Sequence, residues 1–493
     1  MHPFFLVSYN TKKNQFMQIS QVIWDYSFNN IIMDNLSING ILLDDYQMKA
    51  IKAKEKAVLL IAGAGSGKTL TIEGKIKYLI EYEHIKEEEI LCISFTNETV
   101  DNLYNKLKSL GYEIEVKTFH KLGMKYLSNL NYSICDDSSL PFIIDEYFKS
   151  YIKYNKNYER DFKRLFKTFK STETLQSSYE YTELKKTILS FIKLSKANNI
   201  SLYEIYKKYK YSFFKNKTIL KYILEISKIY ENELKSSNKI DMDDIIIKGT
   251  DNVKNFPINY KYIIIDEFQD SSIIRLNLIK ELIHLSNASL FAVGDDYQSI
   301  YGFSGSNLDI FINFKEYFRD SKYYYLKYTY RNSNELIYIS VNFIMKNKHQ
   351  LYKNISSIKN NPKPIKILFN YTIEETLKLI NSNEILILGR NNSDINEINY
   401  DNKLTIHRSK GLECENIILV NSDNIPSKIK NNNIINLINK TKIYIPYEEE
   451  RRLFYVALTR TKNNIYILVN KPSVFIKELM HDYKDLIEIK KKD

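Results

Sequence analysis

Residues 62–69 of the chain read AGAGSGKT and directly follow an apolar run at residues 57–61. A buried strand that turns through glycines into a helix brings backbone N–H groups around phosphate oxygens, and the helix dipole adds positive potential. In this motif the lysine pairs with the β- and γ-phosphates, and the hydroxyl after it is available to Mg²⁺. The chain has only 13 glycines, and Gly63, Gly65 and Gly67 all fall here. The pattern predicts a nucleoside-triphosphate site with Mg²⁺ as cofactor, made by Ala62, Gly63, Ala64, Gly65, Ser66, Gly67, Lys68 and Thr69.

Size, charge and cysteine usage limit the class of protein. With 493 residues the chain has room for roughly two to four domains. A net charge of +12 is compatible with an anionic partner, although lysine-rich solvated surfaces are common. Three scattered cysteines indicate neither a disulfide framework nor a zinc site. No apolar run reaches about 18 residues and the start lacks a signal-peptide pattern, so we expect a cytoplasmic protein without a membrane partner.

Strands and helices alternate after the phosphate-binding motif. The pattern predicts a helix over residues 71–83, a strand over 90–97, a helix over 98–110 and a strand over 116–120. Such alternation indicates an α/β fold with a doubly wound parallel sheet, whose ligands bind at the strand ends. Residues 121–255 instead show helical spacing with almost no glycine, which indicates a helical insertion. Its lysine-rich faces are either simply solvated or touch a nucleic-acid backbone.

Two acids follow the apolar residues 262–265 at once, as expected for the end of a strand. Downstream of a phosphate-binding loop, Asp266 is placed to hold Mg²⁺ through water and Glu267 to polarise the attacking water as a general base. The alternative is a pair of solvated acids, but the phosphate-binding motif favours catalysis.

The next strand pattern, residues 290–293, leads to Gln298, which is placed like a γ-phosphate sensor. Tyr301 and Phe303 follow it, and exposed aromatic side chains there are unusual for a core. A second α/β unit begins near Tyr324, with strands at 384–388, 417–420 and 465–469 and a helix at 449–460. Arginines that project from such a unit towards a triphosphate stabilise charge in the transition state. The Asn-rich residues 429–440 are predicted to form a surface loop.

Taken in order, these motifs resemble those of superfamily 1A DNA helicases of the UvrD/Rep/PcrA type. They are, after Gln47, AGAGSGKT, SFTNETVDNL, VKTFH, IIIDEFQDSS, AVGDDYQSIYGFSGS, YTYRNS, LTIHRSKGLE and EERRLFYVALTRTK, and they span residues 39–470. One such motif can arise by chance, but not this many in one order.

The resemblance implies a role for each matching residue. Those assigned to adenine and ribose are Gln47, Tyr330 and Glu413. Those assigned to phosphate, Mg²⁺ and hydrolysis are Lys68, Thr69, Asp266 and Glu267. Those assigned to the γ-phosphate are Gln298, Arg331 and Arg460. Those assigned to single-stranded DNA are the stacking residues Phe95, Tyr301 and Phe303 and the track-lining residues Thr96, Asn97, His120 and His407.

The chain departs from the family pattern at several places. Phe303 replaces a tryptophan and Ser304 an arginine, which removes stacking area and one cation from the DNA track. Asp44 replaces an asparagine, a change we expect to be tolerated. The largest departure is an absence, because only residues 391–406 separate Arg390 from His407. The family's helical subdomain 2B, which contacts duplex DNA, does not fit there.

The predicted organisation is two RecA-like parallel-sheet domains with a helical 1B insertion in the first and no 2B insertion. The predicted boundaries are 1–38 for an N-terminal extension of unknown role, 39–120 plus 256–323 for the first domain, 121–255 for the insertion, 324–480 for the second domain and 481–493 for a basic tail. No nuclease motif follows Arg460, so we expect no fused nuclease.

The leading hypothesis is an ATP-dependent DNA motor that moves 3′ to 5′ on single strands and acts at junctions of single- and double-stranded DNA. The alternative is an ATPase regulatory subunit of an anti-phage complex, beside an OLD-type nuclease as in Gabija-type systems. A plain P-loop kinase leaves the arginines of the second unit and the stacking aromatics unexplained.

Overall fold

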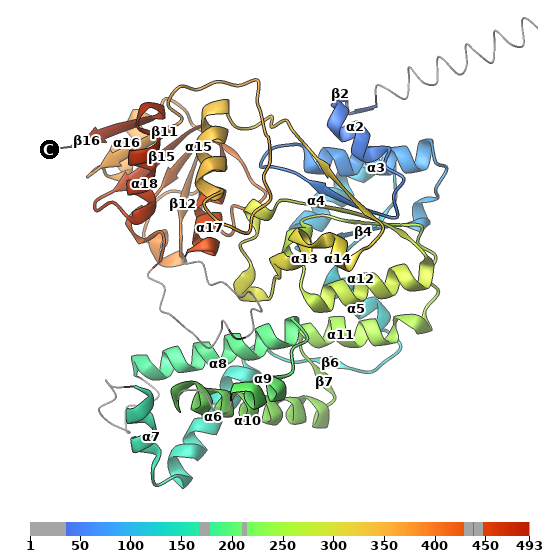
Figure 1. The fold of residues 1–493 in the computed structure, drawn as a ribbon, viewed down its shortest axis with the longest axis vertical. Coiled ribbons are helices and arrows are strands. Elements are labelled where there is room, and N and C mark those ends of the chain that lie inside the picture. The colour runs from blue at the N-terminus through green and yellow to red at the C-terminus, as the bar shows by residue number, and fades with distance from the viewer. Residues whose placement is uncertain (1–35, 167–177, 210–213, 428–436, 438–446, 493) are drawn as a thin grey trace, which may run out of the picture.

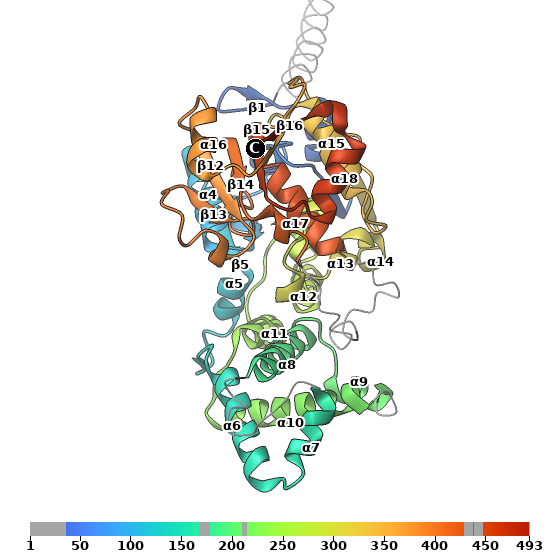
Figure 2. The ribbon, with the colours of Figure 1, turned by 90° about the vertical axis from the view of Figure 1, so that its left-hand side faces the viewer.

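The computed structural model describes residues 36–166, 178–209, 214–427, 437 and 447–492. Two α/β units lie beside each other, and a helical unit extends below the first of them (Figure 1). A view turned by 90° keeps the helical unit apart from both sheets (Figure 2). No helix within the described ranges is long and apolar enough to cross a membrane.

The first sheet has six strands, and all neighbouring strands run parallel. Its central strands are almost continuously apolar, as expected where helices cover both faces of a parallel sheet. In spatial order the strands are β10 (Ser321–Tyr325), β3 (Ala57–Ile61), β9 (Ser289–Gly294), β8 (Tyr262–Ile265), β4 (Ile90–Ser94) and β5 (Glu115–Thr118).

Helices cover both faces of this sheet, each with its own hydrophobic cluster. One face packs against α2 (Asp45–Ile51), α3 (Lys68–Glu81) and α4 (Asn97–Ser109). The other packs against α5 (Phe119–Tyr126), α11 (Met242–Asn252), α12 (Ile273–Ser286), α13 (Leu308–Ile312) and α14 (Phe314–Tyr317).

The second sheet also has six strands in all-parallel pairing. In spatial order they are β13 (Lys403–Thr405), β12 (Ile385–Gly389), β14 (Cys414–Leu419), β15 (Thr461–Val469), β11 (Ile365–Phe369) and β16 (Ile487–Lys491). One face packs against α15 (Asn334–Ile344), α17 (Glu448–Leu458) and α18 (Val474–Asp482), and the other against α16 (Ile373–Leu379). The predicted fold class, two parallel α/β domains with a helical insertion, is confirmed.

The chain passes from β12 to its neighbour β13 through residues 390–402, which contain a single 3₁₀ turn, η7 (Asn392–Asp394). Direct pairing of these two strands agrees with the short spacing between Arg390 and His407 in the sequence.

The helical unit has its own core, formed between Leu140 and Leu234. Its helices are α6 (Ser139–Tyr154), α7 (Tyr158–Leu165), α8 (Tyr179–Ala197), α9 (Leu202–Tyr209) and α10 (Phe214–Ser236). The short parallel pair β6 (Ser133–Ile134) and β7 (Lys239–Ile240) joins it to α5 and α11. Since α5 and α11 pack in the core of the first sheet, the predicted insertion 121–255 is wider than the separate helical core.

Three other boundaries also differ from the prediction. The residues predicted as a basic tail, 481–493, contain β16, whose Ile487 and Ile489 pair with β11. Strand β10 belongs to the first sheet through Tyr325, so the second unit begins later than Tyr324. Leu36 and Ile38 pack against α2 and α3, next to a short hairpin of β1 (Ser37–Ile38) and β2 (Ile41–Leu42). The rest of the predicted extension, with Trp24, and most of the predicted loop 429–440 lie outside the described residues.

Candidate nucleotide site and DNA-facing residues

The phosphate-binding motif connects β3 to α3, and the helix begins at Lys68, earlier than predicted. Gly65 and Gly67 have φ values of 69° and 80°, a region that L side chains rarely adopt. Their neighbours also require glycine. A Cβ at Gly67 would lie 2.7 Å from Nε2 of Gln47, and one at Gly65 would collide with Cβ of Arg331. The loop is therefore enclosed by segments from both α/β units.

The proposed adenine end is built around the first turn of α2. Asp44 caps this helix, accepting from the backbone N–H of Gln47 at 2.9 Å, while Oε1 of Gln47 accepts from the N–H of Asp44 at 2.9 Å. The hydroxyl of Tyr330 donates to the other Asp44 oxygen at 2.8 Å. This arrangement leaves Nε2 of Gln47 buried and without a partner. An unpaired buried donor costs about 1–3 kcal/mol, so the site fits a ligand that offers an acceptor, as the N7 atom of adenine does.

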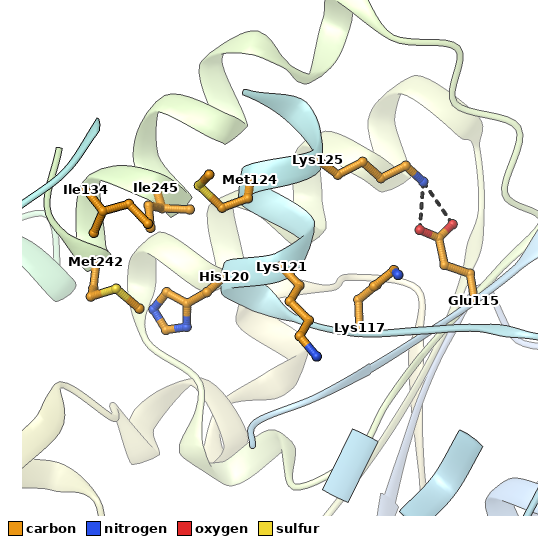
Figure 3. Close-up of a pocket in the computed structure, with 9 residues that line it drawn as sticks. All are labelled: Glu115, Lys117, His120, Lys121, Met124, Lys125, Ile134, Met242 and Ile245. Carbon is orange, nitrogen blue, oxygen red and sulfur yellow. Dashed lines mark hydrogen bonds and ion pairs between the residues drawn. The ribbon is translucent and has the colours of Figure 1, made fainter. Parts of the chain in front are cut away.

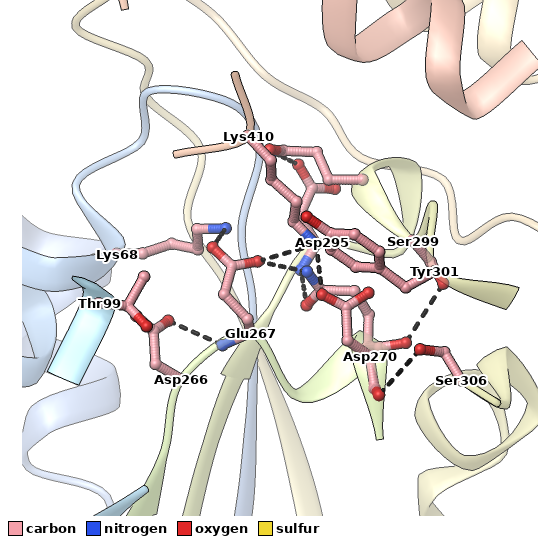
Figure 4. A network of polar contacts seen from close by, with 12 residues as sticks. Lys68, Thr99, Asp266, Glu267, Asp270, Asp295, Ser299, Tyr301, Ser306 and Lys410 are labelled. Atoms are coloured by element: carbon pink, nitrogen blue, oxygen red, sulfur yellow. Dashed lines mark hydrogen bonds and ion pairs between the residues drawn. The ribbon is translucent and has the colours of Figure 1, made fainter. Parts of the chain in front are cut away.

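The two predicted catalytic acids lie at the end of β8, opposite the phosphate-binding lysine (Figure 4). Nζ of Lys68 lies 3.0 Å from Oε1 of Glu267. Glu267 has φ 51°, and its backbone N–H donates to the Asp266 carboxylate at 2.8 Å. The left-handed conformation turns the Glu267 side chain towards the phosphate-binding loop instead of continuing the strand.

Lys410, from the second unit, completes this charge cluster. Its ammonium pairs with Asp270 and lies 3.6 Å from Oε2 of Glu267. Gln269 bridges two segments, because its amide donates to Glu267 and accepts from the backbone N–H of Asp295 at 2.9 Å. Sequence reasoning gave no role to Lys410, Gln269 or Asp270, although all three lie within quoted motifs.

The charges in this cluster set the protonation of the acids. Burial, with the neighbouring Glu267 charge, raises the pKa of Asp266 to about 6. Burial also opposes ionisation of Glu267, but Lys68 and Lys410 outweigh it and hold its pKa below the usual range. Glu267 is therefore a carboxylate at neutral pH, as a general base must be. A cation nearby would favour the ionised form of Asp266. The Asp266 carboxylate and the Thr69 hydroxyl offer the oxygen donors that Mg²⁺ prefers.

The residues predicted to meet the γ-phosphate converge from both units. Nε2 of Gln298 donates to Asp295 at 2.5 Å, and its Oε1 accepts from Arg460 at 3.1 Å. Arg331 donates to Glu413 at 2.8 Å and to the carbonyl of Thr459 at 3.2 Å. Helix α17 ends at Leu458, so Arg460 lies beyond it and not within it as predicted. Burial, with the charge of Arg331, lowers the pKa of Arg460 to about 9.

Three of the predicted DNA-facing residues form one aromatic group, namely Tyr301, Phe303 and His407. The ring of Phe303 lies 6.1 Å from that of Tyr301 and 5.5 Å from that of His407. Phe303 is 60% exposed, whereas the hydroxyl of Tyr301 donates to the carbonyl of His407 at 3.2 Å. Nζ of Lys410 lies 5.0 Å from the centre of the Tyr301 ring. Lys410 thus contacts both the aromatic group and the acids Glu267 and Asp270.

The other predicted DNA-facing residues lie at the ends of β4 and β5. Phe95 packs edge-to-face on Phe119, with the guanidinium of Arg275 5.0 Å from its ring centre. Thr96 and Asn97 are exposed at the start of α4. The strand predicted over 116–120 ends at Thr118, which caps α5 and places His120 in a helix.

His120 lines a hollow of about 560 Å³ beside β5 (Figure 3). Burial, with the charge of Arg275, lowers the pKa of His120 to about 4, so the imidazole is neutral at physiological pH. Lys117 and Lys121 line the same hollow, opposite apolar residues that include Met124 and Met242. The hollow is therefore lined by lysines and Glu115 as well as by apolar side chains.

Comparison with known proteins shows which family the chain resembles. Residues 43–319 match the model of the UvrD/REP helicase N-terminal domain, and residues 383–472 match that of the UvrD-like helicase C-terminal domain. The chain is 26% identical over 481 residues to DNA helicase IV of Escherichia coli (strain K12), covering 89% of this chain and 70% of that protein.

Two further relatives are longer than the region they share with this chain. A probable DNA helicase II homologue of Mycoplasma capricolum is 31% identical over 64% of this chain and 42% of its own length. The ATP-dependent DNA helicase Rep of Buchnera aphidicola subsp. Baizongia pistaciae is 26% identical over 64% of this chain and 45% of its own length. The chain thus spans less than half of these two relatives. With both helicase domain models matched in order, this chain belongs to the UvrD/Rep helicase family.

Proposed function

We propose that the protein is an ATP-dependent DNA helicase that hydrolyses ATP where its two α/β units meet and moves 3′ to 5′ on single-stranded DNA. The observation that carries this proposal is the convergence of both units on one phosphate-binding loop. Arg331 packs against Gly65 of the loop, and Arg460 contacts Gln298 of the first unit at 3.1 Å. Hydrolysis that changes these contacts would change how the two units sit against each other.

For ATP hydrolysis, Glu267 is the general base that takes a proton from the attacking water. Lys68 pairs with Glu267 in this structure, and a bound triphosphate would compete for its ammonium. Arg460 and Arg331 stabilise charge that develops on the γ-phosphate. Thr69 and Asp266 would hold Mg²⁺, which supplies charge neutralisation between the β- and γ-phosphates when bound.

In this proposal Lys410 couples the ATP site to the DNA-facing residues. Its ammonium contacts Glu267 and Asp270 and faces the ring of Tyr301. A DNA base that stacks on the aromatic group would displace the Tyr301 ring or its neighbours. The change would reach Glu267 through the Lys410 side chain. Stacking on aromatic rings is tolerant of sequence, as a motor on DNA requires.

The test is ATP hydrolysis with and without single-stranded DNA, beside unwinding of duplexes that carry a 3′ or a 5′ tail. We expect strong stimulation by single strands and strand separation only with the 3′ tail. Hydrolysis that ignores DNA, or that survives both Lys68→Ala and Glu267→Gln, would reject the proposal.

A second candidate is favoured by the direct pairing of β12 with β13, which leaves no room for a duplex-binding unit there. In this case the chain is an ATPase subunit of a nuclease-containing defence complex, with an OLD-type nuclease as partner. DNA-stimulated hydrolysis without strand separation by the chain alone would support it, if strand separation is restored when the nuclease is co-expressed. Strand separation by the isolated chain would reject it.

A further inference from the structure

A buried lysine outside the predicted site holds the loop that carries Gln298. Lys353 lies in the segment after α15 and is 3% exposed, and Asp295 and Asp296 are fully buried. Its ammonium pairs with Asp295 and lies 2.6 Å from Oδ1 of Asp296. Two adjacent buried carboxylates repel each other and lose hydration, and the Lys353 ammonium offsets both costs.

The two aspartates do different things in the loop. Asp296 accepts from Nε2 of Gln350 at 2.7 Å and from the backbone N–H of Leu351 at 2.8 Å, which fastens the loop to the segment that carries Lys353. Asp295 instead accepts from Nε2 of Gln298 at 2.5 Å. Lys353 therefore contacts Asp295, which in turn contacts the proposed γ-phosphate sensor, Gln298.

Asp295 and Arg460 together decide which way the Gln298 amide points. A carboxylate only accepts hydrogen bonds, so the amide NH₂ must face Asp295 and the carbonyl Oε1 must face away from it. Oε1 then accepts from Arg460, at 3.1 Å. If the Asp295 carboxylate moved from its place, the amide NH₂ would lose this acceptor, and only the bond from Arg460 would orient Gln298.

We propose that Lys353 is a positioning residue for ATP hydrolysis, which holds the Asp295 carboxylate in place through their ion pair and thereby fixes the orientation of the Gln298 amide towards Arg460. With the amide so oriented, the second N–H of Gln298 stays available to the γ-phosphate. This inference rests on the ATP hydrolysis proposed above. It adds a residue that touches neither nucleotide nor DNA in the proposed arrangement.

The first measurement is steady-state ATP hydrolysis by Lys353→Met at saturating oligo(dT). We expect kcat to fall by about tenfold, which is less than the roughly 10²–10³-fold loss seen when a group that itself contacts the developing charge is removed. KM for ATP should stay within about twofold, because the contacts that bind ATP at the adenine end and at the phosphate-binding loop remain. A rise in KM at unchanged kcat would contradict the inference.

A double-mutant cycle separates positioning from general structure. If Lys353 acts through Gln298, the variant carrying both Lys353→Met and Gln298→Ala should have the kcat of Gln298→Ala alone. The matched control is Arg451→Met, which removes a mostly buried cation that pairs with Glu478 at 2.7 Å, away from the loop. Its effect on kcat should be small and independent of Gln298→Ala, so that the two fold-changes multiply in the combined variant. If the fold-changes of Lys353→Met and Gln298→Ala also multiply, the inference is overturned.

A charge-balanced variant covers the case in which Lys353→Met does not fold. Adding Asp296→Asn removes one buried anion together with the buried cation, so the net charge of the cluster is unchanged. We expect this double variant to regain the Tm lost by Lys353→Met while kcat stays low. Recovery of kcat together with Tm would show a purely structural role. A wild-type chain without ATPase activity would instead reject the proposed function itself.

Discussion

At the nucleotide end of the site the charged side chains are buried and paired, whereas at the DNA-facing end the rings are more open and make few polar bonds. Glu267 contacts two lysines and Gln269, and Gln298 contacts Asp295 and Arg460. Phe303, by contrast, is 60% exposed and meets its neighbours through ring contacts.

This difference fits the roles proposed for the two ends. Charge that develops in a transition state is stabilised best by groups already fixed in place, and buried groups need partners to be fixed. A motor must release each base it holds, and stacking on an exposed ring is both sequence-tolerant and easily broken. Single changes at the nucleotide end should therefore have the larger effects.

The largest effect is expected for Glu267→Gln, which removes the base and keeps the shape of the side chain. We expect DNA-stimulated kcat to fall by about 10²–10⁴-fold, the usual contribution of general acid–base catalysis. Lys68→Ala should act on the same scale. The control is Lys108→Ala, an exposed lysine on α4. Comparable loss in the control would remove the contrast between buried and exposed charge.

Lys410→Met tests whether the two ends communicate. It leaves Asp270, whose pKa burial already raises to about 6, without its cation, and it removes the contact between Glu267 and the aromatic group. We expect kcat in the presence of DNA to fall by about tenfold, with most of the stimulation by DNA lost. The measurement is the ratio of hydrolysis rates with and without oligo(dT). An unchanged ratio would mean that DNA acts on the site by another route.

Phe303→Ala tests the DNA-facing end alone. We expect the Kd for oligo(dT) to rise by about tenfold, since stacking on one aromatic side chain is worth about 1–3 kcal/mol. Hydrolysis without DNA should stay unchanged. Tyr338→Ala is the control, because this ring on α15 is 58% exposed. Fluorescence anisotropy measures both, and equal weakening in the two variants would contradict a dedicated stacking role.

The smallest effect concerns pH. The pKa of Asp266, raised to about 6 by burial and by Glu267, means that this carboxyl becomes ionised as pH rises from 5.5 to 7.5. Mg²⁺ prefers the ionised form, so its binding releases a proton and strengthens as pH rises. The Mg²⁺ concentration for half-maximal hydrolysis should fall by about fourfold, the ratio of ionised fractions of such a group. An increase with pH would exclude Asp266 as the ligand.

Local features of the chain were predictable from sequence. Buried strands such as β3 and β8 are continuous apolar runs, and two of the three glycines of the phosphate-binding loop, Gly65 and Gly67, have positive φ. Errors arose where two signals compete. Strand β16 alternates Ile487 and Ile489 with charged residues, but the many lysines of this segment hid the alternation. His120 follows the short strand Glu115–Thr118 in sequence, but Thr118 caps a helix there.

Sequence by itself determined the two α/β units and the phosphate-binding loop, because glycine turns and apolar periods are properties of neighbouring residues. Only the tertiary structure decided which charges meet. Lys410 and Asp270 are 140 positions apart, and Lys353 and Asp295 are 58 apart. Burial makes such pairs strong by removing water, and it depends on how the units pack against each other. The periodicity of the sequence does not predict how the units pack.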